Sequence, residues 1–135
     1  MAISILNVGH FEYEQPLQMA ANRSAEYSLL HTVTDPAEAR DWAGEHQPDI
    51  TVVDVSRLKG DGIQFLRGFR ADPACADLAL LALVNENDRE QRRLVLRAGA
   101  NEFITTPLDT YECEVRLLNM LTVRAHRRLI TQAAI

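Results

Sequence analysis

Short apolar runs and segments with helical spacing alternate along the whole chain. The third apolar run, Ile50 to Val53, is β-branched throughout and bounded by polar residues, which is typical of a buried strand in a parallel sheet. Four further runs have the length of strands: Ile3 to Val8, Tyr27 to Val33, Leu78 to Val84 and Glu102 to Thr105. Five strands alternating with five helices predict an α/β fold, a doubly wound five-stranded parallel sheet covered by helices on both faces.

Capping residues mark the helix boundaries. We expect the first helix around Leu17 to Arg23. Asp35, Asp88 and Asp109 each precede a helical pattern, and aspartate is among the side chains preferred at a helix N-cap. Gly99 closes the fourth helix, because glycine readily takes the left-handed conformation that ends many helices. No low-complexity segment interrupts this order.

Composition limits the classes of function. A chain of 135 residues with 47% hydrophobic and 24% charged residues is typical of one globular domain. The net charge of -5 argues against a nucleic-acid partner, since such surfaces need clustered Lys and Arg to neutralise phosphates. We interpret the one basic cluster, residues 124–128, as a solvated helix end, which the helix dipole favours.

The same limits apply to membranes and to cysteine chemistry. No apolar run approaches the ~20 residues that span a bilayer. The N-terminus has neither the basic segment nor the cleavage site of a secretory signal, so we expect a cytoplasmic protein with no membrane partner. Cys75 and Cys113 show neither metal-ligand nor disulfide spacing, which predicts two reduced, structural thiols.

Asp54 is the residue that demands a functional explanation. It ends the third predicted strand, and in doubly wound sheets the functional site lies outside the carboxyl ends of the strands. Neither a phosphate-cradling loop after the first strand nor a nucleophile elbow at Ser56 is present, so we expect no catalysis on a separate substrate.

Two segments carry a family resemblance. The stretch from Asp49 to Val55, followed by Asp61-Gly62 and Phe65-Leu66, resembles the third strand and following loop of response-regulator receiver domains. The stretch from Leu96 to Asp109 is similar to the alanine-glycine-alanine, strand and proline signature of that family. The resemblance covers nearly the whole chain in the right order and implies the flavodoxin-like fold of receivers.

The resemblance also implies a reaction. In that family the aspartate that ends the third strand accepts a phosphoryl group from a histidine kinase or phosphotransfer protein, and Asp54 occupies this position. The added phosphoryl group brings about two negative charges, so the site needs positive charge and donors held ready. Receivers supply these with Mg²⁺ held by an acidic pair after the first strand, a Ser or Thr after the fourth and a Lys after the fifth.

This chain departs from the family pattern at each of these helpers. Gly9 and His10 stand where the acidic pair is expected, and Val84 stands at the hydroxyl position. Thr106 precedes Pro107 in place of the lysine, before a peptide bond that is often cis in the family. Mg²⁺ prefers several carboxylate oxygens, so we expect any metal binding at Asp54 to be weak.

Three side chains are candidate substitutes. Asn85 offers an amide donor beside the hydroxyl position, and Lys59 in the loop after Asp54 could swing over the site, with surface solvation as its alternative role. His10 could pair with the Asp54 carboxylate and lower its pKa. A transition metal on this pair would have too few ligands. Glu12 is expected to be solvated in the first helical turn, with an inward orientation toward the site as the alternative.

Two mechanisms follow from these departures. One is a phosphorelay receiver with Asp54 as its phosphoacceptor. The other, which we favour, is a receiver-like protein-interaction module that works without phosphorylation. In both, the contact surface is the face formed by the fourth helix, fifth strand and fifth helix. Phe103 takes the family's aromatic switch position there, with plain strand packing as its alternative role.

The last helix extends beyond the expected domain. We expect a receiver domain over residues 1–123 and a helical extension over 124–135, which pairs with a second copy in a homodimer or leads to an output domain; a frayed tail is the alternative. The stretch Val115 to Arg124 resembles the exit helix of receivers joined to cyclic-di-GMP enzymes. Its apolar positions recur at three- and four-residue intervals: Val115, Leu118, Leu121, Ala125 and Leu129.

Overall fold

The computed structural model describes residues 2–24, 27–58 and 61–133, with side chains up to residue 122. The elements follow one another in the predicted alternation. They are β1 (Ala2–Val8), η1 (Phe11–Tyr13), α1 (Glu14–Ser24), β2 (Tyr27–Val33), α2 (Pro36–His46), β3 (Ile50–Asp54), α3 (Asp61–Ala71), β4 (Leu80–Asn85), α4 (Arg89–Arg97), β5 (Glu102–Thr106) and α5 (Thr110–Ala133).

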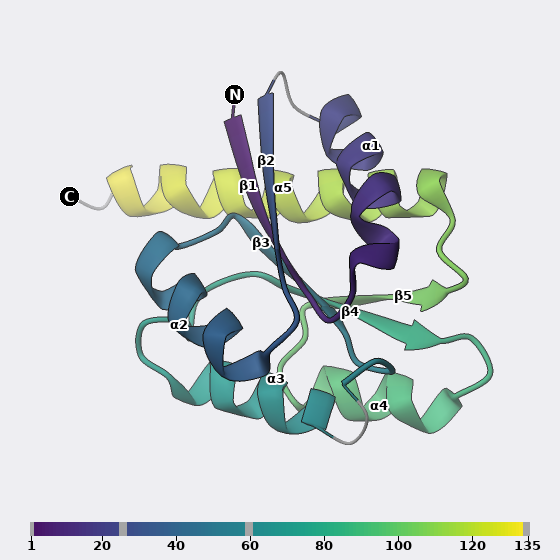
Figure 1. Ribbon diagram of the computed structural model, residues 1–135. Helices are drawn as coiled ribbons and strands as arrows, with labels where there is room; N and C mark the ends of the chain where they lie inside the picture. Colours follow the sequence, from purple (N-terminus) through teal and green to yellow (C-terminus); the bar gives the residue numbers. More distant parts are fainter. Residues whose placement is uncertain (1, 25–26, 59–60, 134–135) are drawn as a thin grey trace.

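The strands form one parallel sheet in the order β2-β1-β3-β4-β5. Helices α1 and α5 cover one face, and α2, α3 and α4 cover the other (Figure 1). The predicted fold is thereby confirmed. Strand β2 lies beside β1 toward one edge of the sheet, and β3 lies beside β1 toward the other edge. The strand order therefore switches direction at the carboxyl ends of β1 and β3.

Strand β3 is enclosed on both faces of the sheet. All five of its residues are buried. Ile50 and Val52 pack under α1 and α5, whereas Val53 packs in the layer beneath α2, α3 and α4. Alternate side chains of a strand point to opposite faces, so Asp54 follows Val52 onto the α1 and α5 face.

The predicted caps are present. Asp35 accepts a hydrogen bond from the Ala37 N–H at 3.4 Å, and Asp88 accepts one from Gln91 at 2.9 Å. Asp109 caps α5 by accepting from the Glu112 N–H at 3.0 Å. Because these bonds satisfy N–H groups that have no partner within the helix, they locate the helix starts that the sequence indicated.

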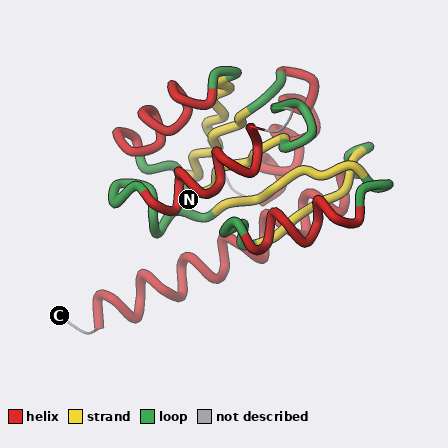
Figure 2. The backbone as a smooth tube through the Cα atoms, turned by 90° about the horizontal axis from the view of Figure 1, so that it is seen from below, coloured by secondary structure: helices red, strands yellow, loops and turns green. Residues whose placement is uncertain are grey.

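Helix α5 is the longest element, with 24 residues, and it projects past the end of the sheet (Figures 1 and 2). The expected boundary between residues 123 and 124 lies inside it. The side chains of the basic cluster at residues 124–128 lie outside the described ones. Within the described part of the chain, no helix combines the length and apolar character needed to cross a membrane.

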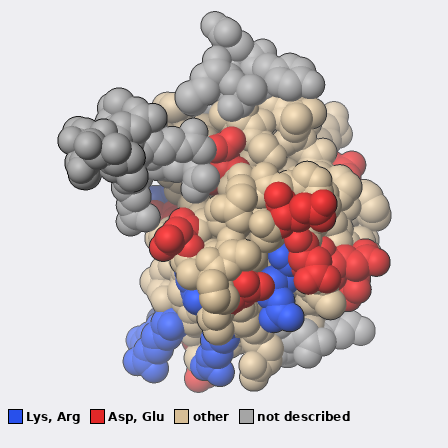
Figure 3. Space-filling view, turned by 90° about the vertical axis from the view of Figure 1, so that its left-hand side faces the viewer, with Lys and Arg blue, Asp and Glu red and all other residues tan. Residues whose placement is uncertain are grey.

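The surface on the side of α2 and of the C-terminal end of α5 is mixed in charge. Figure 3 shows acidic side chains over the middle of this face and basic side chains along its lower edge. Among the described residues drawn on this face, the basic side chains do not form a continuous surface.

Candidate functional site: the closed carboxylate at the end of β3

Asp54 lies at the point where the strand order switches, and it is fully buried. It is the last residue of β3 and pairs in register with Leu83 of β4. Its side chain is only 1% exposed. An ionised carboxylate in such a place requires partners, because burial removes the water that stabilises its charge.

One carboxylate oxygen of Asp54 is well supplied with donors. The Ser56 hydroxyl donates to Oδ1 at 2.8 Å, and the Arg57 backbone N–H donates to the same atom at 3.3 Å. The other oxygen, Oδ2, accepts no hydrogen bond and has the Arg57 Nε atom at 3.9 Å. The pKa of Asp54 is raised, chiefly by burial, with Glu12 adding to the rise and Ser56 and Arg57 opposing it.

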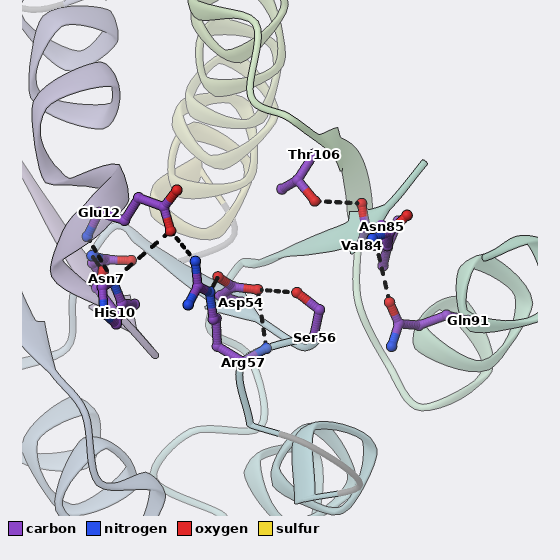
Figure 4. Close-up of polar contacts among 10 residues, drawn as sticks. All are labelled: Asn7, His10, Glu12, Asp54, Ser56, Arg57, Val84, Asn85, Gln91 and Thr106. Carbon is purple, nitrogen blue, oxygen red and sulfur yellow. Dashed lines mark hydrogen bonds and ion pairs between the residues drawn. The ribbon is translucent and has the colours of Figure 1, made fainter. Parts of the chain in front are cut away.

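Arg57 lies between two carboxylates. Besides its contact with Asp54, its guanidinium donates to Glu12 in a short ion pair, and the three side chains form a row in Figure 4. Glu12 belongs to η1, and His10 caps this turn by accepting from the Glu12 N–H at 3.0 Å. The pair therefore ties the loop after β3 to the loop after β1, beside the carboxylate.

Gly9 brings the end of β1 unusually close to Asp54. Its φ of 134° lies in the region that glycine alone adopts readily. A Cβ atom built on Gly9 would lie 2.9 Å from the Cβ of Asp54, closer than such atoms approach in real structures. With this backbone, an aspartate at position 9 does not fit.

The lysine position of the family holds a small hydroxyl. The Thr106 hydroxyl donates to the Val84 carbonyl at 3.4 Å, and the peptide bond between Thr106 and Pro107 is cis, as expected. Tyr13 reaches the same region. Its pKa is raised by burial and then by Asp54 and Glu12, while a hydrogen bond with Thr106 opposes the rise.

Of the substitutes proposed from the sequence, Asn85 and His10 are engaged in other contacts. Asn85 is exposed, and its Oδ1 accepts from the Asn87 N–H at 2.9 Å within its own turn. The His10 ring is used in capping η1, and the expected pair between His10 and Asp54 is not formed. Lys59 lies outside the described residues. Phe103 is half-buried and packs against the core beneath α4.

Sequence reasoning missed Arg57 and underestimated Glu12. We expected Glu12 to be solvated; it is half-exposed, yet its carboxylate pairs with Arg57 beside Asp54. The sequence did contain a signal for Arg57. It stands three residues after the aspartate that ends the third strand, and a turn at this point brings a side chain with that spacing close to the carboxylate.

The residues present suit a divalent metal poorly. Mg²⁺ prefers several oxygen ligands in octahedral geometry. The two carboxylates near the site, Asp54 and Glu12, already share the Arg57 guanidinium, and the close approach at Gly9 leaves no space for an acidic side chain. No group of three or more His, Cys, Asp or Glu side chains in the described ranges is arranged to hold a metal ion.

Comparison with known proteins identifies the class. Residues 14–117 match the response regulator receiver domain, which is most of the chain. The chain therefore belongs to the response-regulator receiver family of two-component signalling.

Its relatives are longer proteins with further domains. Response regulator PleD of Caulobacter vibrioides is 30% identical over 109 residues, which is 81% of this chain and 24% of the relative. Cyclic di-GMP phosphodiesterase response regulator RpfG of Xanthomonas campestris is 27% identical over 101 residues, 75% of this chain and 27% of the relative. The transcriptional regulatory protein PhoP of Escherichia coli is 30% identical over 90 residues, 64% of this chain and 40% of the relative. The chain thus spans well under half of these relatives.

Solved structures agree on the fold. NtrX from Brucella abortus superimposes with a TM-score of 0.83 at 19% identity, over 98% of this chain and 30% of that one. Chemotaxis response regulator CheY4 of Vibrio cholerae superimposes with a TM-score of 0.73 at 19% identity, over 90% of this chain and 99% of that one. The second match covers nearly all of both chains, so the two share their fold throughout.

Proposed function

We propose that this receiver domain signals by protein contact without phosphorylation, and that Asp54 is a structural carboxylate closed inside the fold. The observation that carries the proposal is the burial of Asp54 together with its built-in partners. Ser56 and Arg57, in the loop after β3, contact the Asp54 carboxylate. Glu12, in the turn after β1, forms an ion pair with Arg57. A phosphoryl donor would have to displace this arrangement to reach the carboxylate oxygens.

Charge supports the same conclusion. A phosphoryl group adds about two negative charges, which a receiver must neutralise with cations held ready. Here one guanidinium already serves two carboxylates. Of the remaining family positions, His10 accepts a hydrogen bond from the Glu12 N–H as the cap of η1, and the other three hold Gly9, Val84 and Thr106. None of these three side chains carries positive charge.

The test is phosphoryl capture at Asp54. Wild-type protein and Asp54→Asn are incubated with acetyl phosphate and Mg²⁺ and analysed by intact-protein mass spectrometry; an ordinary receiver in the same reagents shows that they are active. Beryllofluoride binding, followed by fluorine NMR, covers the case of a receiver that only its kinase phosphorylates. We expect no adduct in either arm. An adduct on the wild type that Asp54→Asn lacks would reject the proposal.

A second function is favoured by one specific observation. The Ser56 hydroxyl and the Arg57 N–H converge on the same Asp54 oxygen, and the Arg57 guanidinium lies 3.9 Å from the other. If Asp54 accepts a phosphoryl group in a phosphorelay, these are the donors that replace the missing helpers. Arg57→Ala should then abolish the adduct, whereas His10→Ala should leave it.

The partners follow from the family. For a domain that binds without phosphorylation, we propose a histidine kinase or phosphotransfer protein as the upstream contact, through the surface of α4, β5 and α5. An output domain, such as the cyclic-di-GMP enzyme named in one relative, is the downstream contact. Asp54→Asn should leave either interaction nearly unchanged, and a large loss of binding would contradict the phosphate-independent mechanism.

A further inference from the structure

Strand β2 forms one edge of the sheet and, among the described strands, pairs with β1 alone. In Figure 1 it lies between α1 and α2. The Val33 carbonyl accepts a hydrogen bond from the Gly9 N–H at 3.1 Å, so the backbone groups of Val33 face β1. Backbone groups of successive residues point alternately to the two sides of a strand. The residues whose N–H and C=O groups point away from β1 are therefore Ser28, Leu30 and Thr32.

The edge of β2 lacks the features that prevent pairing with another strand. Edge strands are commonly protected by charged side chains, proline, a bulge or short length. The opposite edge strand, β5, has five residues, and its Glu102 pairs with Arg116 of α5 at 3.5 Å. Strand β2 has seven residues and contains no Asp, Glu, Lys, Arg or Pro. Its register with β1 is continuous, so no bulge turns it away.

The side of β2 that faces α2 presents an apolar and aromatic surface. Leu29 is 56% exposed, and His31, two residues further on, lies on the same face of the strand. The His31 ring stacks on Trp42 of α2 with the ring centroids 4.6 Å apart, and the His46 ring also stacks on Trp42, at 4.2 Å. An added strand would cover Leu29 and extend this packing.

Acidic side chains of α2 lie beside this surface. Glu38 and Glu45 stand four residues before and three residues after Trp42, the spacing of neighbours on a helix. Both are exposed, and neither forms an ion pair with another described residue. Arg40, the only Lys or Arg of α2, pairs with Asp72 at 3.9 Å instead. Figure 3 shows acidic side chains on this side of the molecule, so a cationic partner is favoured.

The side of β2 that faces α1 is polar and uncharged. The Gln18 amide donates to the Ser28 hydroxyl oxygen at 2.6 Å, and the Ser28 hydroxyl donates to the Asn22 amide oxygen at 2.8 Å. A side chain of an added strand that points to this side meets amide and hydroxyl groups. Small polar side chains such as serine and threonine suit it.

We propose that β2 binds an extended segment of a partner protein, which adds to the sheet as a further strand. This segment carries apolar residues and Lys or Arg on the side that meets Leu29 and α2, and small polar residues on the side that meets α1. Main-chain hydrogen bonds to the outward groups of β2 provide affinity, and the alternate side chains provide specificity.

A second copy of β2 is a poorer occupant of the edge. An antiparallel pair of β2 strands would place both α2 helices on the same face of the joined sheet, where Glu38 and Glu45 of the two copies repel one another. The edge lies at the opposite end of the strand order from β5. The inference rests on neither Asp54 nor its phosphorylation, so the failure of either proposal leaves the other standing.

The probe is a synthetic peptide in which threonine alternates with lysine, valine, valine and lysine in turn. Trp42 is the only tryptophan of the chain, so its fluorescence reports binding beside β2. The peptide should bind, and a version with glutamate in place of lysine should bind at least about tenfold more weakly, because it faces the α2 carboxylates. Methylation of the peptide N–H groups that face β2 should abolish binding, although every side chain is kept.

Amide hydrogen exchange locates the bound peptide. The N–H groups of Ser28, Leu30 and Thr32 should become protected when the peptide is added. The N–H groups of Leu29 and His31, which face β1, should already be protected in the protein alone. This alternation distinguishes strand addition from binding by charge alone.

Two matched variants test the position. Leu29→Lys removes an apolar contact and places a cation against the peptide lysines, so it should raise the dissociation constant at least about tenfold. Leu96→Lys on α4 is the control, because Leu96 is also an exposed leucine, at 46%. It should leave binding unchanged. Circular dichroism verifies that both variants are folded.

Four outcomes would overturn the proposal. The first is that millimolar peptide changes neither Trp42 fluorescence nor the exchange of β2 amides. The second is binding that survives methylation of the peptide backbone, because strand pairing would then not be the contact. The third is an equal loss of binding in Leu29→Lys and Leu96→Lys. The fourth is self-association of the wild type that Leu29→Lys abolishes, which would assign the edge to a second copy of the chain.

Discussion

The Nε atom of Arg57 lies 3.9 Å from Oδ2 of Asp54, while the same guanidinium is held by Glu12. This one contact changes the chemistry of the site. The family resemblance implies a metal ion and a lysine around the aspartate, whereas here a side chain from the same loop provides positive charge. Because the Arg57 guanidinium is a side chain of the protein itself, it partly neutralises the Asp54 carboxylate without a bound metal ion.

Removing Arg57 should therefore destabilise the domain. Arg57→Ala leaves the buried Asp54 carboxylate with Ser56 and one backbone N–H, and it leaves the Glu12 carboxylate with His10 Nδ1 at 4.0 Å as its remaining ion-pair neighbour. The guanidinium is half-exposed, so we expect a loss of only about 1–2 kcal/mol in the free energy of unfolding. Urea denaturation at neutral pH measures it.

A surface arginine provides the control for that experiment. Arg97→Ala, on the exposed side of α4, should change the unfolding free energy by less than about 0.5 kcal/mol. Arg57→Lys should lie between the wild type and Arg57→Ala. If Arg57→Ala proves as stable as Arg97→Ala, the pair contributes nothing and Asp54 is not compensated in the manner described.

Gly9 should tolerate no side chain. Gly9→Ala combines an unfavourable φ with a Cβ that would lie 2.9 Å from the Cβ of Asp54, so we expect a loss of about 1–3 kcal/mol in stability. Gly9→Asp, which would restore one acid of the family's pair, should cost at least as much and should not create a metal site. Thermal unfolding with and without Mg²⁺ measures both.

Gly68 offers the matched control in helix α3. A Cβ there would meet only the tip of the flexible Arg40 side chain, at 3.0 Å. Gly68→Ala should therefore leave stability unchanged or raise it by up to about 1 kcal/mol, because alanine is the better helix former. Equal losses at Gly9 and Gly68 would mean that the close approach to Asp54 is not the cause.

Most of the fold could be predicted from the sequence, because its signals are local. The β-branched run from Ile50 and the caps at Asp35 and Asp88 placed elements close to their observed bounds. Two boundaries differ by more than one residue. The fourth strand begins at Leu80 rather than Leu78, since Leu78 is buried but takes part in a turn with Cys75. The first helix begins earlier, at Glu14, directly after η1.

The site could be predicted only in part. Strand ends converge in a parallel sheet, so Gly9, Asp54 and Thr106 could be assigned to one place from the chain order alone. The direction in which a loop side chain points could not be predicted from the chain order. The direction of Arg57 depends on Glu12, 45 residues earlier, and that contact exists only once β1 and β3 lie side by side.

The two cysteines should be inert in the folded protein. Burial raises the pKa of Cys113 to about 12, with a contribution from Glu112, and burial also raises the pKa of Cys75. The thiolate is the reactive form, so both should resist a disulfide reagent at pH 8 and react only on unfolding. Labelling with and without urea measures this, and fast reaction of either thiol in the native protein would contradict the described burial.

Asp54→Asn should make stability less dependent on pH. The pKa of Asp54 in the folded chain is raised above its ordinary value of 3.8. The carboxyl group therefore binds its proton more tightly in the folded state than in the unfolded state. This proton stabilises the fold fully below pH 3.8, and the stabilisation is lost as the pH rises through the pKa of the folded state. Ionised Asp54 thus penalises the fold at neutral pH, and the neutral amide removes the penalty.

The comparison of unfolding free energies across pH makes this measurable. Relative to the wild type, Asp54→Asn should be most favoured near neutral pH, and its advantage should shrink as the pH falls toward 4. Asp41→Asn on the exposed face of α2 serves as the control and should show no such trend. An advantage that instead grew toward acid pH would mean that Arg57 and Ser56 outweigh burial, so that Asp54 is held as a charge ready to react rather than as a closed carboxylate.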